Sequence, residues 1–230
     1  MFTIYMNYSI YIVIIVIFTC LYGYYLTKKE SLTIKEMFTD NSTIILLGDS
    51  VFKNNLYVPT PDVSIEKQLK LENPNIINEA QDGAVIIDVL YQLEKVPYKY
   101  NTKNTNIYVS AGGNDIIYYY LYKNIPKSNL DQLNIIFEKY KKLINSLLVK
   151  FDEPKIFVFD IYYPQSNRYK PFYPLIKIWN NKLQDLCREK NIEFIPISDE
   201  MTEKSDLTHE IEPSSIGGLK IVQQIMNTHR

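Results

Sequence analysis

Ile44-Ile45-Leu46-Leu47-Gly48-Asp49-Ser50 is the stretch of sequence that decides the fold. Four large aliphatic residues in a row have the length and composition of a strand buried on both faces, as in a parallel sheet covered by helices. In open α/β sheets, ligands bind at the carboxyl ends of the strands. Ser50 stands at that end, directly after a glycine, so its hydroxyl is the first candidate nucleophile.

The chain beyond this strand alternates strand-like and helix-like segments. Four further strands are predicted at residues 75–80, 105–110, 155–163 and 192–197. Helical spacing of apolar residues predicts helices at residues 84–96, 128–148, 174–191 and 214–226. Because parallel strands need crossover connections, this order predicts an α/β fold, a three-layer α/β/α sandwich with a five-stranded parallel sheet.

Composition limits the kinds of protein that this chain can be. With 230 residues and 46% hydrophobic content, it can bury one sizeable core, so one domain with an appendage is expected. The formal net charge of -1 offers no basic surface for nucleic acid, and none is expected as a partner.

Residues 1–27 are predicted to form a transmembrane anchor. No charged side chain occurs from Phe2 to Thr27, and a span of about 20 apolar residues crosses a bilayer as a helix. A secretory signal peptide is the alternative, but the segment has no Lys or Arg before its apolar run and no small residues at a cleavage site.

The charges after this segment predict how the chain is oriented. Lys28, Lys29 and Lys35 follow the apolar span and none precedes it, so the positive-inside tendency places the main domain on the cytosolic side of the membrane. Residues 28–40 are then a juxtamembrane linker, and residues 41–230 form the main domain.

Polar or glycine-rich turns follow the first three predicted strands. They are Gly48-Asp49-Ser50, residues 78–83 and Gly112-Gly113-Asn114-Asp115. Parallel strands bring such turns to one edge of the sheet. A fourth polar segment, Asp206-Leu207-Thr208-His209, follows the fifth strand and can reach the same edge. One site built from these segments is expected.

The fourth segment contains candidates for the groups that activate a serine. Acyl transfer by serine needs a base to take the hydroxyl proton and a group to orient that base. The chain has 2 histidines, and His209 is the candidate base because His229 is the penultimate residue, where fraying is expected. Asp206 precedes His209 closely enough for its carboxylate to orient the imidazole in a tight turn.

The other turns contain candidate donors for the oxyanion that forms during acyl transfer. The backbone N–H groups of Ser50 and Gly83 and the side-chain amide of Asn114 are the candidates, and glycine suits a place where backbone approaches substrate. The neighbouring Asp49 and Asp115 are expected to hydrogen-bond turn amides and to fix the loops.

From residue 43 to the C terminus, the chain resembles the SGNH hydrolases of the GDSL esterase/lipase superfamily. The resemblance rests on four blocks in this order: Gly48-Asp49-Ser50-Val51, residues 78–83, Gly112-Gly113-Asn114-Asp115 and Asp206-Leu207-Thr208-His209. Val51 stands where leucine is usual and Ala80 where glycine is frequent. These departures affect the subfamily and the substrate more than the mechanism.

The resemblance implies both a fold and a set of roles. The implied fold is a flavodoxin-like parallel sheet with strand order 2-1-3-4-5, and the implied chemistry needs no metal or organic cofactor. Ser50 is then the nucleophile, Gly83 and Asn114 are oxyanion donors with the Ser50 amide, and Asp206 and His209 complete the triad.

The predicted function is that of a membrane-anchored serine hydrolase that cleaves carboxylic esters through an acyl-enzyme, as esterases, lipases and deacetylases do. Its substrates would be small-molecule, lipid or glycan esters. An acyltransferase with the same triad is one alternative, and a non-catalytic membrane-anchored binding or scaffold domain is another. The joint presence of Ser50, Asn114, Asp206 and His209 favours catalysis over a scaffold.

Overall fold

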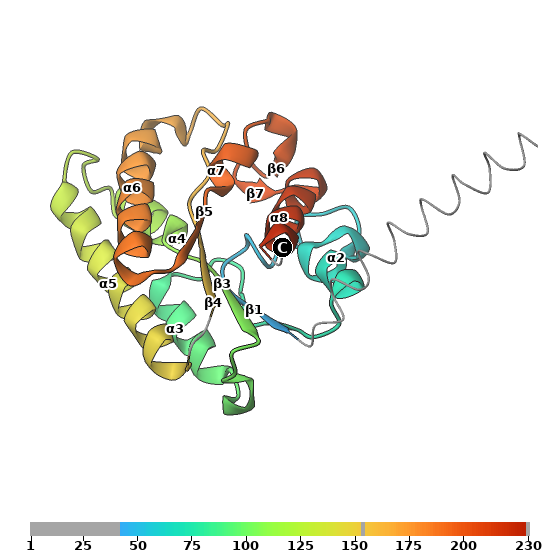
Figure 1. Ribbon diagram of the computed structural model, residues 1–230. Coiled ribbons are helices and arrows are strands. Elements are labelled where there is room, and N and C mark those ends of the chain that lie inside the picture. Colours follow the sequence, from blue (N-terminus) through green and yellow to red (C-terminus); the bar gives the residue numbers. More distant parts are fainter. Residues whose placement is uncertain (1–41, 153–154, 229–230) are drawn as a thin grey trace, which may run out of the picture. The chain divides into compact units, whose positions relative to one another are not determined.

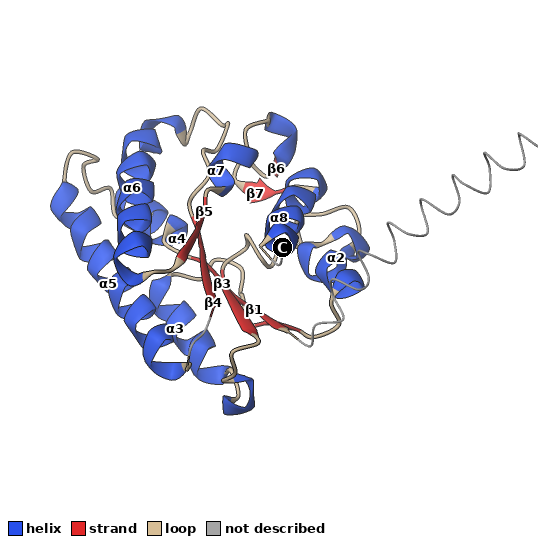
Figure 2. Ribbon diagram, viewed as in Figure 1, coloured by secondary structure: helices blue, strands red, loops and turns tan. Residues whose placement is uncertain are grey.

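The central sheet of the computed structural model has five parallel strands in the order β2-β1-β3-β4-β5, and the structure describes residues 42–152 and 155–228 (Figure 2). The strands are β1 (Thr43–Gly48), β2 (Ile76–Asn78), β3 (Thr105–Ser110), β4 (Lys155–Phe159) and β5 (Glu193–Ile195). The predicted parallel sheet and its strand order are confirmed. β1 lies between β2 and β3, with Gly48 opposite Ser110 at its carboxyl end.

Helices cover both faces of this sheet (Figure 1). One face carries α3 (Ile86–Lys95), α4 (Gly113–Ile117), α5 (Leu130–Lys150) and α6 (Tyr173–Lys190), and the other carries α2 (Ile65–Glu72), α7 (Ile197–Glu200) and α8 (Ser215–Asn227). In β1, Ile45 and Leu47 belong to the first hydrophobic core, whereas Ile44 and Leu46 belong to the second. The apolar run is continuous because both of its faces are buried.

A short antiparallel hairpin precedes α8, and its strands are β6 (Leu207–Thr208) and β7 (Glu212–Pro213). Thr208 lies opposite Glu212, and the tip residues His209 and Glu210 have φ values of 45° and 72°. Such left-handed backbone is uncommon for residues other than glycine. The sequence predicted a polar segment here but no hairpin, because strands of two residues leave no periodic signal.

Close packing joins this hairpin to α8. The Ser214 side chain caps the helix by accepting hydrogen bonds from the backbone N–H groups of Ile216 and Gly217. A Cβ atom on Gly217 would overlap the carbonyl oxygen of Asp206, so glycine allows the helix to lie directly on the chain before the hairpin.

The predicted anchor (residues 1–27), the predicted linker (28–40) and His229 lie outside the described residues. Among the helices that the structure describes, none is both long and apolar enough to span a bilayer.

Candidate active site

The carboxyl end of β1 is held by a buried glutamine from α3. The Gly48 N–H donates to Gln92 Oε1 at 2.7 Å, and Gln92 Nε2 donates to the Gly48 carbonyl at 2.8 Å. A Cβ atom on Gly48 would overlap the Ser110 carbonyl oxygen, so glycine is required where β1 approaches β3. These contacts fix the backbone immediately before the turn that carries Ser50.

Asp49 closes that turn. Its Oδ1 accepts hydrogen bonds from the Val51 N–H at 3.1 Å and from the Ser110 hydroxyl at 3.3 Å. Burial raises the pKa of Asp49 to about 7, although these hydrogen bonds favour its charged form. The prediction that Asp49 binds a turn amide is confirmed, and the side chain before the candidate nucleophile titrates near neutral pH.

The second and third turns are joined to each other at the same edge. Asn114 Nδ2 donates to the Ala84 carbonyl at 3.0 Å, and Asp115 accepts from the Ile86 N–H at 2.9 Å. Burial raises the pKa of Asp115 to about 6. Asp115 thus fixes the loops, as predicted, by holding the start of α3 against the turn that carries Asn114.

The predicted oxyanion donors keep unused hydrogen-bonding capacity. In the described part of the chain, the backbone N–H groups of Ser50 and Gly83 donate to no protein acceptor. Gly83 has a φ of 71°, and apart from residues 82–84 no described atom lies within 4 Å of the place where its Cβ atom would be. Ser50 itself is 8% exposed, so its hydroxyl is largely shielded from bulk water.

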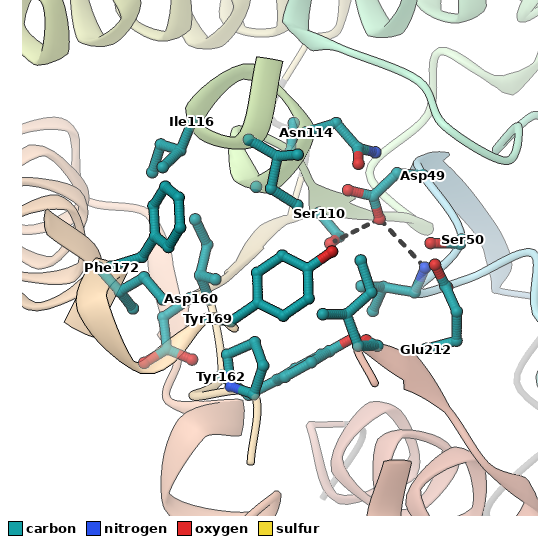
Figure 3. A pocket seen from close by; sticks show the side chains of 18 residues that line it. Asp49, Ser50, Ser110, Asn114, Ile116, Asp160, Tyr162, Tyr169, Phe172 and Glu212 are labelled. Carbon is teal, nitrogen blue, oxygen red and sulfur yellow. Dashed lines mark hydrogen bonds between the residues drawn. The ribbon is translucent and has the colours of Figure 1, made fainter. Parts of the chain in front are cut away.

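A pocket opens beside Ser50, and five of the polar residues that line it gather around this serine, whereas Asp160 lies on the opposite side (Figure 3). These polar residues are Asp49, Ser50, Ser110, Asn114 and Glu212. The remaining wall is mostly apolar and is formed by Ile116, Ile117, Ile161, Tyr162, Pro164, Tyr169, Phe172, Ile176 and Ile211. An ester whose carbonyl lies at Ser50 therefore has an apolar surface beside it.

Asp160 also lines the pocket, but its carboxylate is engaged in the fold. It accepts hydrogen bonds from the Ser198 N–H at 2.9 Å, the Ser198 hydroxyl at 2.6 Å and Asn180 Nδ2 at 3.2 Å. Burial raises the pKa of Asp160 to about 6. This residue ties the end of β4 to α6 and α7.

Asp206, the predicted orienting carboxylate, is fully buried and pairs with a lysine. Its Oδ2 accepts from Lys220 Nζ and from the Glu203 N–H, both at 2.8 Å. Its Oδ1 has no hydrogen-bond partner among the described residues. These contacts connect Asp206 to α8 and to the chain before the hairpin.

His209, the predicted base, lies exposed at the tip of the hairpin. Its Nδ1 is 3.3 Å from the Thr208 hydroxyl, and its ring centroid is 5.6 Å from that of Tyr57. Within residues 42–152 and 155–228, no hydrogen bond joins His209 to Asp206 or to Ser50. The structure brings Ser50, the candidate nucleophile, to the same sheet edge as the turns that carry the candidate oxyanion donors. The roles of these residues and the triad stay predictions.

Glu212 is the residue at this site that the sequence did not single out. Its side chain extends from β7 toward Ser50 (Figure 3). Hydrogen bonding from the Ser50 hydroxyl favours its charged form, but burial outweighs this effect and raises the pKa of Glu212. Its Oε2 is buried and lacks a partner of regular hydrogen-bond geometry in the described part of the chain. A single glutamate before a helix carries no catalytic motif, so no sequence signal identified it.

No protein-family model matches this sequence, and no curated protein matches it at a significant level. Several solved structures do match. A member of the lipolytic protein G-D-S-L family from Veillonella parvula is 14% identical, with 81% of this chain and 97% of that chain covered and a TM-score of 0.61. An acetylxylan esterase from Geobacillus stearothermophilus is 12% identical, with 82% and 94% covered and a TM-score of 0.60. The described residues therefore have the fold of the SGNH hydrolases.

Proposed function

We propose that this chain is a serine ester hydrolase in which the Ser50 hydroxyl attacks the ester carbonyl and forms an acyl-enzyme. The observation that carries the proposal is the position of Ser50 at the end of β1, beside a pocket and with a backbone N–H that donates to no acceptor among the described residues. A tetrahedral oxyanion at Ser50 would accept hydrogen bonds from the Ser50 and Gly83 N–H groups and from Asn114 Nδ2. Such fixed donors stabilise negative charge as it develops, at no cost of reorganisation.

The acyl group of the substrate would occupy the apolar wall between Ile117 and Phe172. Burying each methylene of an acyl chain contributes about 0.8 kcal/mol. Esters of medium-length acids are therefore expected to react faster than acetyl esters, although the acetylxylan esterase among the structural neighbours makes acetylated glycans a second substrate class to test.

Removing the serine proton requires a base. The sequence predicts His209 for this role, oriented by Asp206, and a triad of Ser50, His209 and Asp206 would act as serine hydrolases do. In the described residues, His209 is exposed and Asp206 is paired with Lys220.

The proposal includes attachment to a membrane through residues 1–27, with the hydrolase domain on the cytosolic side. The support is the uncharged apolar sequence of this segment and the lysines that follow it. Attachment of this kind would bring the pocket within reach of lipid esters. Protease protection of the chain in sealed membrane vesicles tests both the attachment and the side.

Covalent labelling tests the central claim. A fluorophosphonate probe is expected to label the wild-type protein at Ser50, and Ser50→Ala should abolish both the labelling and ester hydrolysis. Ser110→Ala is the matched control, because Ser110 is a second buried serine in the same pocket and its hydroxyl donates to Asp49. A folded wild-type protein that reacts with neither probe nor esters would contradict the proposal and favour a scaffold function.

A further inference from the structure

We infer that Glu212, and not the predicted His209, is the base that takes the proton from Ser50, an inference that rests on the proposed esterase function. The structure places the Glu212 side chain in the pocket beside the Ser50 hydroxyl (Figure 3). His209 does not line this pocket. A general base must lie within hydrogen-bond reach of the proton that it removes, and of these two residues only Glu212 is so placed.

The carboxylate of Glu212 also has unused accepting capacity. Its Oε2 is buried and has no partner of regular geometry in the described part of the chain. Buried polar atoms are nearly always paired, so an unpaired carboxylate oxygen beside a serine calls for an explanation. The explanation is that Glu212 accepts a proton, first from the serine and later from the attacking water.

The backbone around Glu212 is anchored on both sides. The Tyr162 hydroxyl donates to the Ile211 carbonyl at 2.6 Å, and Asn54 Nδ2 donates to the Pro213 carbonyl at 3.4 Å. Glu212 itself pairs with Thr208 across the hairpin. The carboxylate is therefore positioned by its neighbours, whereas His209 lies beyond them at the tip.

The electrostatic surroundings of Glu212 suit a base. The titratable side chains that interact with it are Asp49, Tyr57, Asp82, Tyr162, Tyr169 and His209. Burial raises the pKa of Glu212 above the ordinary value of 4.5, and the negative charge of Asp82 adds to this effect, while His209 opposes it. A carboxylate with a raised pKa is a stronger base than an exposed one.

The reaction then runs in two balanced halves. Glu212 takes the hydroxyl proton as Ser50 Oγ bonds to the ester carbon, and the resulting carboxylic acid returns this proton to the alcohol as the ester C–O bond breaks. In the second half, Glu212 takes a proton from water as the water oxygen attacks the acyl-serine. That proton passes to Ser50 Oγ as the acid product leaves, so the sum is ester plus water giving acid plus alcohol.

Steady-state hydrolysis of p-nitrophenyl esters by the full-length chain tests this inference. Glu212→Gln keeps the size of the side chain and removes its basicity, so kcat should fall by about 10²–10⁴-fold. Glu210→Gln is the matched control, since Glu210 lies two residues away on the same hairpin and its exposed carboxylate pairs with Arg168 and accepts from Ser166. Its turnover should stay within about threefold of wild type.

His209→Ala separates the two candidate bases. A loss much smaller than that of Glu212→Gln supports Glu212, and an equal or larger loss overturns the inference in favour of His209. Turnover within threefold of wild type in Glu212→Gln also overturns it. Circular dichroism of each variant shows whether a loss of activity reflects unfolding.

The pH profile gives a readout that a merely structural role would not move. If Glu212 is the base, kcat/KM falls at acid pH as Glu212 is protonated, and Glu212→His should shift this limb to the pKa of an imidazole, about 6.5 in the absence of perturbation. An unshifted limb in an active Glu212→His variant counts against the inference. Absence of any Ser50-dependent turnover in the wild-type protein would instead overturn the proposed function, and the inference with it.

Discussion

Replacing Gln92 by leucine should destabilise the protein and loosen the turn that carries Ser50. The side chain is 1% exposed, and both of its hydrogen bonds go to the backbone of Gly48. Leucine is similar in size, so the main cost is the loss of hydrogen bonds and not a cavity. The Gly48 carbonyl keeps a second donor, the Gln81 N–H at 3.0 Å, but the Gly48 N–H is left without an acceptor.

The loss of stability follows from the two hydrogen bonds that Gln92→Leu removes. A buried donor left unsatisfied costs about 1–3 kcal/mol, and the bond lost by the still-paired carbonyl adds about 1 kcal/mol. The free energy of unfolding should therefore fall by about 2–4 kcal/mol. The fluorescence of Trp179, the only tryptophan in the sequence and fully buried, provides the signal for urea unfolding. kcat should fall as well, because the carboxyl end of β1 positions Ser50.

Gln68→Leu provides the control for this substitution. Gln68 lies on α2 and donates to the Asp62 carbonyl at 2.8 Å in an exposed setting, so its replacement should change the free energy of unfolding by less than about 0.5 kcal/mol. If Gln92→Leu costs no more than Gln68→Leu, the buried glutamine does not hold the end of β1 as argued.

Two further predictions concern pH and acyl specificity. Burial raises the pKa values of Asp49, Asp115 and Asp160 from 3.8 to about 7, 6 and 6, so the folded protein binds more protons than the unfolded protein between these limits. The stability that these residues contribute is therefore present at acid pH and lost as the pH rises from about 4 to 7. Urea titrations at several pH values measure how the free energy of unfolding changes with pH, and Asp49→Asn should make this change smaller. Ile117 is half-buried and lines the pocket, so Ile117→Phe should fill part of the space beside it. This change should lower kcat/KM for hexanoyl esters relative to acetyl esters by about tenfold or more. An unchanged ratio would place the acyl group elsewhere.

The sheet could be predicted because its strands are buried on both faces. Ile44 to Leu47 alternate between two cores, and such burial demands a continuous apolar run that the sequence shows directly. The helix α2 was not predicted, since only Ile65 and Leu69 of its eight residues are buried and a short helix with two core contacts has little periodicity.

The site could be predicted only in part, for a related reason. Ser50, Gly83 and Asn114 follow strands of the sheet, so the rule that parallel strands end at one edge was enough to bring them together. Glu212 depends on the hairpin, whose strands of two residues and left-handed tip leave no pattern in the sequence. A functional residue on a short connection of this kind can be located only from the tertiary contacts in the structure.

The hairpin also explains why sequence spacing and geometry favour different bases. Asp206 and His209 are three residues apart, which allows contact in a tight turn, but the intervening residues form β6 and the His209 side chain lies at the exposed tip instead. The return strand then places Glu212 opposite Thr208 and beside Ser50. Because burial raises the pKa of Glu212 toward that of an imidazole, the comparison of variants decides between the two bases. A change in the acid limb of the pH profile in Glu212→His, with no such change in His209→Ala, assigns that limb to Glu212.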